Sequence, residues 1–143
     1  MSIQAILYEK GSSVACVAAS ASVKAAADKL RELNIAALIV KRGPSVVGIV
    51  SEREIVQAVS LHGAAIATMS VGDILTRNVV AVAPEDSLKR AMTLMTRNRA
   101  RHLLVLRDNE PAGIVSIGDV IKHQLEDLQL NRSIWRDAQI GAH

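Results

Sequence analysis

Apolar residues along this chain follow two spacings, and the spacing changes repeatedly from that of a strand to that of a helix. Short runs that are almost entirely apolar, such as 35–40 and 101–106, are typical of buried strands. Apolar residues that recur every three or four positions, as in 22–33 and 88–95, predict amphipathic helices. Strands are predicted at 14–17, 35–40, 45–50, 79–82, 101–106 and 111–116, and helices at 2–10, 22–33, 51–62, 88–95 and 117–128.

The pattern from residue 14 to 128 consists of one unit that occurs twice. The order strand, helix, strand, strand, helix is repeated, and residues 17–57 align with 82–122 without a gap. Of these 41 aligned positions, 12 are identical, and several of the others exchange one apolar residue for another. The chain is therefore a structural duplication, and a site in one copy has a counterpart in the other.

Each copy has a polar pair at the point where its last strand becomes its last helix. In the second copy, residues 113–121 read Gly-Ile-Val-Ser-Ile-Gly-Asp-Val-Ile, which places Ser116 and Asp119 at this junction. In the first copy the corresponding pair is Ser51 and Glu54. Unpaired backbone N–H groups at the start of a helix favour an anion or a hydroxyl-rich ligand.

These residues resemble a known family. The segments Ser51-Glu52-Arg53-Glu54, Arg101-His102-Leu103-Leu104-Val105 and Ser116-Ile117-Gly118-Asp119-Val120 are similar to those of small stand-alone bacterial proteins with a pair of CBS domains. The resemblance covers about residues 14–128. It implies two small sheets packed together, with two clefts for adenine nucleotides such as AMP, ADP, ATP, NAD or S-adenosylmethionine. It also implies dimers that sense and regulate rather than catalyse.

We therefore predict an α+β fold of tandem CBS domains, in which two β-α-β-β-α repeats pack with pseudo-twofold symmetry. The sequence departs from the family where Glu54 replaces the usual Asp and Leu104 replaces a common Pro. The predicted divisions are an N-terminal capping helix at 1–13, repeat 1 at 14–62, a connector at 63–75, repeat 2 at 76–128 and a C-terminal tail at 129–143.

The carboxylates of Asp119 and Glu54 are the predicted ribose ligands, because an ionised carboxylate can accept both ribose hydroxyls. Each has an alternative. Asp119 is also a favourable residue for the start of a helix dipole. Ser51-x-x-Glu54 is also a capping-box pattern, which would explain both residues without a ligand. Ser116-x-x-Asp119 fits that box less well, because Asp is shorter than Glu or Gln.

Arg101, His102 and Arg53 are the predicted phosphate contacts, since Arg offers a planar fork of donors. Their alternatives are a surface Arg, a structural His, and an Arg that is solvated or paired with a neighbouring acid. Apolar strand residues are expected to hold the adenine, with the core as the alternative role, which is favoured for Val17 and Val82. The full set of predicted nucleotide-binding residues is Cys16, Ser51, Arg53, Glu54, Val80, Ala81, Arg101, His102, Leu103, Ser116 and Asp119.

Composition narrows the class of protein. Half of the residues are hydrophobic but there is no Phe, one Trp and one Tyr. The net charge is only +3, yet residues 89–102 hold five Lys or Arg and no acid, which attracts phosphate. Nucleic acid is not the expected partner, because no aromatic residues are interleaved for base stacking. The four His are too scattered to form a recognisable metal pattern.

The compartment is predicted from what the sequence lacks. A single cysteine, Cys16, fits a reducing environment. The N-terminus has no basic segment ahead of an apolar one, so no signal peptide is expected. No apolar run approaches the roughly 20 residues that span a bilayer. We expect a cytoplasmic protein that does not enter membranes.

The leading hypothesis is a homodimeric regulatory module that binds an adenine nucleotide as a ligand, with no catalytic cofactor, and acts on a regulated protein that the sequence does not identify. Val56, Val59, Ile121 and Leu125 are the expected dimer contacts, because apolar patches of this kind usually mark an interface. The alternative is a ligand-independent dimerisation or interaction module. A nucleotide hydrolase is a weaker third hypothesis, since no metal constellation and no base–nucleophile pair is visible.

Overall fold

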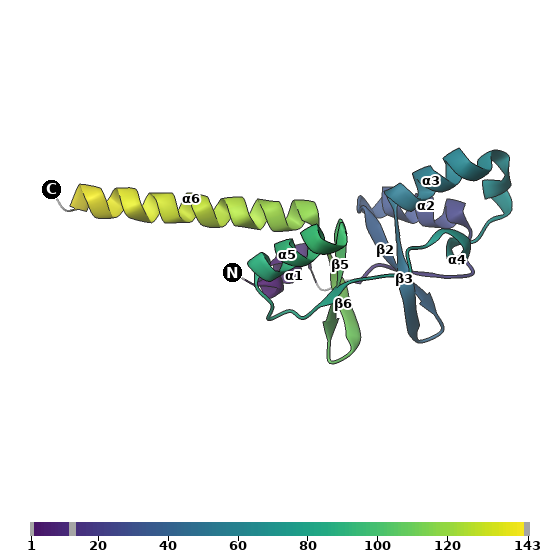
Figure 1. Ribbon diagram of the computed structural model, residues 1–143, viewed down its shortest axis with the longest axis horizontal. Coiled ribbons are helices and arrows are strands. Elements are labelled where there is room, and N and C mark those ends of the chain that lie inside the picture. Colours follow the sequence, from purple (N-terminus) through teal and green to yellow (C-terminus); the bar gives the residue numbers. More distant parts are fainter. Residues whose placement is uncertain (1, 12–13, 142–143) are drawn as a thin grey trace.

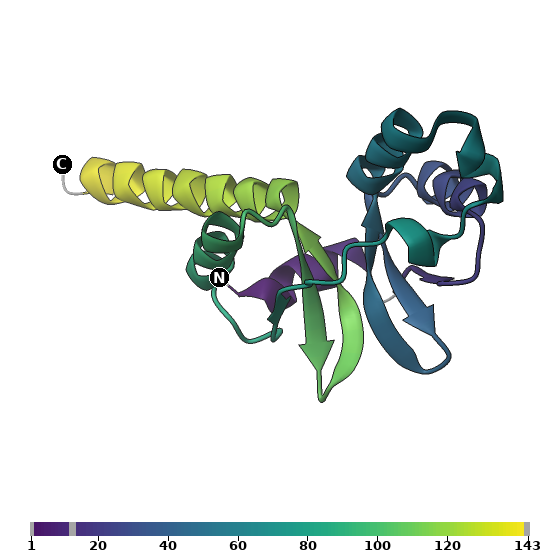
Figure 2. The same ribbon diagram turned by 45° about the vertical axis from the view of Figure 1, so that its right-hand side comes forward.

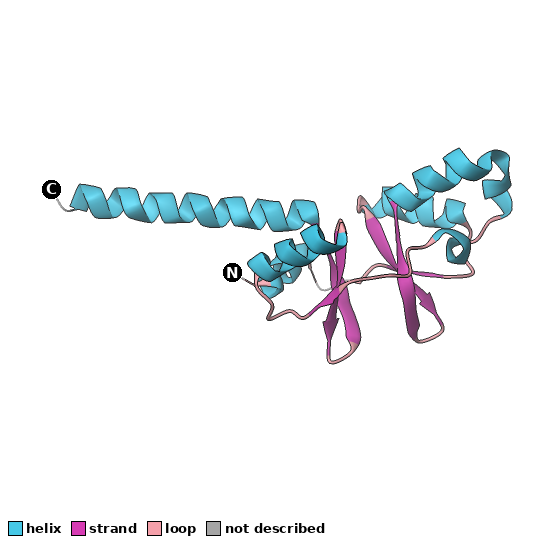
Figure 3. Cartoon of the chain, viewed as in Figure 1, coloured by secondary structure: helices cyan, strands magenta, loops and turns pink. Residues whose placement is uncertain are grey.

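The computed structural model describes residues 2–11 and 14–141 of the 143-residue chain (Figure 1). Its helices and strands alternate as the two patterns predict, and Figure 3 separates them by colour. Before and within repeat 1 the elements are α1 (Ile3–Lys10), β1 (Cys16–Ala18), α2 (Val23–Leu33), β2 (Ala37–Arg42), β3 (Ser45–Ser51) and α3 (Glu52–His62). After it come η1 (Gly63–Thr68), α4 (Val71–Ile74), β4 (Ala81–Val82), α5 (Leu88–Asn98), β5 (His102–Arg107), β6 (Glu110–Ser116) and α6 (Ile117–Gly141).

Two three-stranded sheets with the same topology form the centre of the molecule. The sheets have the orders β1-β2-β3 and β4-β5-β6, and in each the first pair of strands is parallel and the second antiparallel. Even an irregularity is repeated: the register shifts between Val40 and Lys41 and again between Val105 and Leu106. The predicted α+β fold of two repeats is confirmed, and the two sheets also share their register shift.

The repeat also extends to the ends of its first helix. Ser22 Oγ accepts a hydrogen bond from the backbone N–H of Ala25 at 3.0 Å, and Ser87 Oγ accepts one from Arg90 at 3.0 Å. Such N-caps satisfy backbone donors that a helix start leaves unpaired. At the other end, Asn34 and Arg99 are both left-handed, with φ of 53° and 50°. Asn adopts this conformation readily, whereas Arg does so at some cost.

Three apolar clusters hold the fold together. Each repeat has its own, formed where the sheet packs against its helices. The third lies between the repeats, where Ile39 and Ile49 of one sheet meet Leu104 and Ile114 of the other. Figure 2 shows the two sheets facing each other across this contact. Because the third cluster is as apolar as the other two, the repeats form one body rather than separate lobes.

The two short helices that precede the repeats are exchanged between them. α1 precedes repeat 1, yet its Ile3, Ile6 and Leu7 are buried in the core of repeat 2. α4 precedes repeat 2, yet its Val71 is buried in the core of repeat 1. The predicted capping helix at the N-terminus therefore covers the far repeat, with hydrogen bonds to residues 80 to 104 positions further along the chain.

Several predicted boundaries are wrong. The last helix was expected to end near residue 128, but α6 continues to Gly141 and projects from the body (Figures 1 and 2). β1 begins two residues later than expected and β4 contains only two residues. The connector at 63–75 contains the 3-10 helix η1 and α4. Of the predicted tail, 142–143 lie outside the described residues. In the described ranges, no helix has the length and apolarity to cross a bilayer.

Candidate functional site

A pocket of about 480 Å³ lies between the two repeats, where both strand-to-helix junctions approach each other. Its volume falls within the range of small-molecule sites. Repeat 1 contributes the first junction, defined here as residues 51–54, and repeat 2 contributes the start of β5 and Ser116 of the second junction, residues 116–119. The lining residues are Ala36, Ile49, Ser51, Glu52, Arg53, Glu54, Gln57, Thr76, Asn78, Val79, Val80, Asn98, Arg99, Ala100, Arg101, His102, Ser116 and Ile117.

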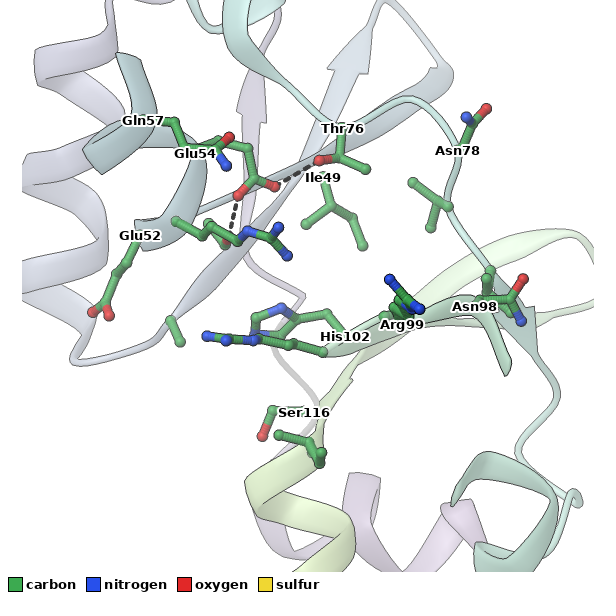
Figure 4. Close-up of a pocket in the computed structure, with 18 residues that line it drawn as sticks. Ile49, Glu52, Glu54, Gln57, Thr76, Asn78, Asn98, Arg99, His102 and Ser116 are labelled. Carbon is green, nitrogen blue, oxygen red and sulfur yellow. Dashed lines mark hydrogen bonds between the residues drawn. The ribbon is translucent and has the colours of Figure 1, made fainter. Parts of the chain in front are cut away.

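The Glu54 carboxylate is presented to hydroxyl groups. Ser51 Oγ donates to Glu54 Oε2 at 2.5 Å, and Thr76 Oγ1 donates to Oε1 at 2.7 Å (Figure 4). The expected capping box is absent, because neither side chain bonds the backbone N–H groups of the helix start. The long Glu side chain extends past those groups to Thr76 instead. Each carboxylate oxygen keeps a further lone pair for another hydroxyl.

Cationic side chains from both repeats line the pocket. Arg53, Arg99 and Arg101 are all exposed, and within the described ranges none of them takes part in an ion pair. Figure 4 shows Arg99 and His102 across the pocket from Glu54 and Thr76. Three unpaired guanidinium groups around one pocket attract an anion, and phosphate matches their planar donors.

His102 is the titratable group between these two regions. Burial lowers the pKa of His102, and the nearby Lys10 and Arg101 lower it too, while Glu54 and Asp119 raise it. The net shift is downward, so the imidazole is neutral near pH 7. A neutral ring both donates and accepts one hydrogen bond, and an anion bound beside it would favour its charged form.

The second junction differs from the first in its contacts. Ser116 N–H donates to Asp119 Oδ2 at 2.8 Å, and Asp119 N–H donates to Ser116 Oγ at 3.0 Å. This reciprocal pair of hydrogen bonds is a capping box. It occurs at the second junction, where the shorter Asp side chain made a capping box the less expected outcome. Lys10 Nζ also contacts Asp119 Oδ2 at 2.8 Å and the Ile114 carbonyl at 2.9 Å. Burial by itself would raise the pKa of Asp119, but the hydrogen bonds from Lys10 and Ser116 hold that pKa below its usual value.

The pocket collects seven of the eleven residues that the sequence predicted for the nucleotide. The other four lie elsewhere. Leu103 has no exposed surface and is packed in the core of repeat 2, because alternate residues of β5 face opposite sides of the sheet. Cys16 packs in the cluster between the sheets, Ala81 does not line the pocket, and Asp119 is held by Lys10. The seven are Ser51, Arg53, Glu54, Val80, Arg101, His102 and Ser116.

Sequence reasoning missed several lining residues. Thr76 and Asn78 belong to the stretch between α4 and β4, whose sequence gave no sign of chemistry. Arg99 was counted in the basic run but not in the site. The sequence did contain a signal for Arg99, because Arg99 aligns with Asn34, a residue type that often ends a helix in the left-handed conformation. Both residues are the C-caps of their helices, and the chain turns there.

Comparison with known proteins identifies the fold. The model of the CBS domain matches residues 11–61 and again residues 71–126. The chain belongs to the CBS domain family. These two matches coincide with the two sheets and their helices, so the recognised family and the duplication describe the same units.

Several relatives have the same pair of domains. A mitochondrial CBS domain-containing protein of Arabidopsis thaliana is 37% identical over 119 residues, which are 76% of this chain and 58% of that protein. The solved CBS-domain containing protein of Agrobacterium tumefaciens is 36% identical, with a TM-score of 0.82 over 87% of this chain and 99% of that one. A candidate signal-transduction protein with CBS domains from Burkholderia ambifaria is 33% identical, with a TM-score of 0.82 over 89% and 96%.

Membership of the family sets the general role. CBS domains typically bind adenosine ligands, and CBS proteins often form oligomers. Stand-alone CBS-pair proteins are regulatory modules without catalytic activity, and this chain is similar to small bacterial proteins of that type. The hypothesis of a nucleotide hydrolase is therefore set aside.

Proposed function

We propose that this CBS pair binds an adenosine-containing nucleotide, such as AMP, ADP, ATP or NAD, in the pocket between its repeats. One observation carries the proposal: a carboxylate bonded to two hydroxyls and three arginines without an ion pair among the described residues lie in one pocket of suitable size. The donors and acceptors that a nucleotide needs are thus gathered from both repeats.

The nucleotide is proposed to lie with its ribose at Glu54. Its 2′ and 3′ hydroxyls would join or replace the hydroxyls of Ser51 and Thr76, which already bond that carboxylate. Arg99 and Arg101 would pair with the phosphate, since a charge-assisted hydrogen bond is stronger than a neutral one. The adenine would pack on the apolar part of the lining, formed by Ile49, Val79, Val80 and Ala100.

Binding across two repeats supplies a means of signalling. A nucleotide that contacts α3 through the first junction and β5 through its phosphate favours one relative placement of the repeats. A change in that placement alters the surface formed by α3 and α6. We propose that a regulated protein reads this surface, and that the module works in the cytoplasm, which its single cysteine fits.

The proposed assembly is a homodimer through α3 and α6. The four apolar residues expected at the interface are well exposed: Val56 by 67%, Val59 by 53%, Ile121 by 48% and Leu125 by 54%. These exposed faces also favour the second candidate function, a dimerisation or interaction module that needs no ligand. A monomer in sedimentation at micromolar concentration would contradict the dimer in either case.

Calorimetric titration of AMP, NAD and adenosine into the purified protein tests the proposal. We expect binding of at least one adenosine ligand, with a raised melting temperature, because a ligand of the folded state stabilises it. Glu54→Ala should abolish most of the heat. Glu52→Ala removes the same charge from the pocket lining, but within the described residues the Glu52 side chain bonds no hydroxyl, so affinity should be unchanged or slightly higher. If none of these ligands binds, the ligand-independent module becomes the better account.

A further inference from the structure

The end of α1 and the first turns of α6 carry a cluster of polar side chains outside the nucleotide pocket. His123 Nε2 lies 2.7 Å from Glu9 Oε2, and His123 Nδ1 lies 4.0 Å from Glu126 Oε2. Lys122 Nζ contacts the other oxygen of Glu9 at 3.0 Å. The cluster joins two helices that are more than 100 residues apart in the chain.

The composition of this cluster is that of a metal site. One ligand atom from each of Glu9, His123 and Glu126 lies within 4.8 Å of the others. The His123 side chain is only 7% exposed, whereas the two carboxylates are about half exposed. Imidazole with carboxylates suits zinc and similar transition metals, whereas Ca²⁺ and Mg²⁺ prefer oxygen ligands alone.

We propose that Glu9, His123 and Glu126 bind a divalent transition-metal ion such as zinc. One nitrogen of the buried ring and one oxygen of each carboxylate are the ligands, and water completes the coordination. With metal–ligand distances of about 2.0–2.2 Å, tetrahedral ligands lie roughly 3.4 Å apart. Glu9 Oε2, which lies 2.7 Å from His123 Nε2, must therefore draw back by roughly 0.7 Å to admit an ion at that nitrogen. The exposed Glu126 side chain, which lies nearest to Nδ1, must swing toward the same nitrogen, while the buried His holds its position.

Lys122 competes with this ion for the Glu9 carboxylate. Its ammonium group lowers the pKa of Glu9 through a hydrogen bond and through charge, so it already stabilises the carboxylate that the metal would use. The metal has to displace this ammonium from Glu9 or share the carboxylate with it. Replacing Lys122 is expected to tighten metal binding, which a purely structural role for the cluster does not predict.

Binding would fasten α1 onto α6 beside the second junction. Lys10, the residue after Glu9, holds Asp119 one turn before His123. A metal at the cluster thus stabilises the contact between Lys10 and Asp119. The competing interpretation is that the direct contacts of His123 and Lys122 with Glu9 fasten the two helices without a metal, with Glu126 as an ordinary surface residue.

Glu126→Gln separates the two interpretations. This variant keeps the 2.7 Å contact between His123 and Glu9 and the ion pair of Glu9 with Lys122, but it removes one proposed ligand. Without metal it should melt at the wild-type temperature. With zinc it should lose the thermal shift, and its affinity should fall by at least about tenfold, the scale seen even for residues that only support metal ligands.

The experiment uses the tag-free full chain, dialysed against chelator and titrated with Zn²⁺ by calorimetry and thermal unfolding. The expected result is one ion per chain, a melting temperature raised by several degrees, and Co²⁺ absorption bands that Glu126→Gln lacks. Lys122→Met should bind zinc more tightly, and His62→Gln on the remote end of α3 should bind it as the wild type does. Equal zinc binding by Glu126→Gln and wild type, or no zinc-dependent shift in the wild type, would overturn the proposal.

Discussion

The two strand-to-helix junctions are copies of one design, yet one is open to a ligand and the other is engaged by the protein itself. Glu54 and Asp119 occupy equivalent positions in the two repeats. Glu54 accepts hydrogen bonds from two hydroxyl groups at the edge of a pocket. Asp119 accepts them from a backbone N–H and from the ammonium group of Lys10.

The difference arises in the helix that comes before each repeat. A side chain at Gly48 would collide with Leu75, at the end of α4, and one at Gly113 would collide with Leu7 of α1, so the two helices reach equivalent places. The chain then leaves them differently. After Leu75 it becomes extended, and Thr76 pairs with the backbone of Ile49.

After Leu7, in contrast, α1 continues to Lys10. This additional turn carries an ammonium group to the position where the other repeat has a hydroxyl. Lys10 neutralises the Asp119 carboxylate, which would otherwise be available to a ribose. The two sites therefore differ in part because of a short extension of a neighbouring helix. The neighbouring helix thus adds to the difference that Glu54 and Asp119 themselves make between the two sites.

The largest expected effect comes from removing the two carboxylates. Glu54→Ala should weaken AMP binding at least about a hundredfold, because two hydrogen bonds to a charged group are lost at roughly 1.5–3 kcal/mol each, and water replaces them only in part. Asp119→Ala should change affinity by less than about twofold. It should instead lower the stability by about 1–2 kcal/mol through loss of the capping box. Calorimetry and chemical unfolding measure both. A hundredfold loss in Asp119→Ala would show that the second junction is the binding one.

Arg99→Asn tests the phosphate side of the open site and compares it with Asn34 in the other repeat. AMP binding should weaken about tenfold through loss of a charge-assisted bond, while adenosine binding stays the same. The fold should become more stable by about 0.5 kcal/mol, because Asn adopts the left-handed conformation more readily than Arg. Equal losses for AMP and adenosine would contradict a phosphate role for Arg99.

Lys10→Met should make the second junction resemble the first. With the ammonium group gone, Asp119 becomes available to hydroxyls, and we expect a second, weaker nucleotide per chain in place of one. The capping box remains, so the fold should persist. Titration at high protein concentration gives the stoichiometry, and the Lys10→Met, Asp119→Ala double variant should return it to one. A stoichiometry of one in Lys10→Met would show that Lys10 does not block the second site.

The smallest effect concerns pH. Burial lowers the pKa of His102, so without ligand the neutral ring contributes stability above its ordinary pKa of about 6.5, and this contribution is lost as pH falls through the folded value. A bound phosphate raises that pKa, so binding takes up protons. Affinity for AMP should therefore rise a few-fold between pH 7 and pH 5.5. His102→Gln should lose that additional rise, and equal slopes in the two proteins would exclude the role.

Much of the fold follows from local patterns. The gapless alignment of the repeats predicted the paired sheets, and Ser22 and Ser87 were visible as helix starts. The capping box, weighed as the alternative at the first junction, occurs at the second instead, because side-chain length was considered without the neighbouring residues that bond the side chain. Glu54 turns away from the helix start toward Thr76, which is 22 residues further along the chain.

The closure of the second junction was harder to predict. Lys10 and Asp119 are 109 residues apart, and only the exchange of the short helices brings them together. A partial signal existed, since Lys10 follows Ile6 and Leu7 at helical spacing and so shares their buried face. What that face covers is decided by tertiary packing. The same holds for the cluster of Glu9 with His123, whose members looked scattered in the sequence.

The exchange of α1 and α4 has a consequence for the time course of synthesis. α1 leaves the ribosome first, but the residues that bury its Ile3, Ile6 and Leu7 lie between 82 and 120. At about 5–20 residues per second, the apolar face of this helix stays uncovered for several seconds or more while the rest is made. Repeat 1 obtains its own cover, α4, much sooner. The chain is therefore expected to fold from repeat 1 onward, and its first segment is expected to be the last to dock.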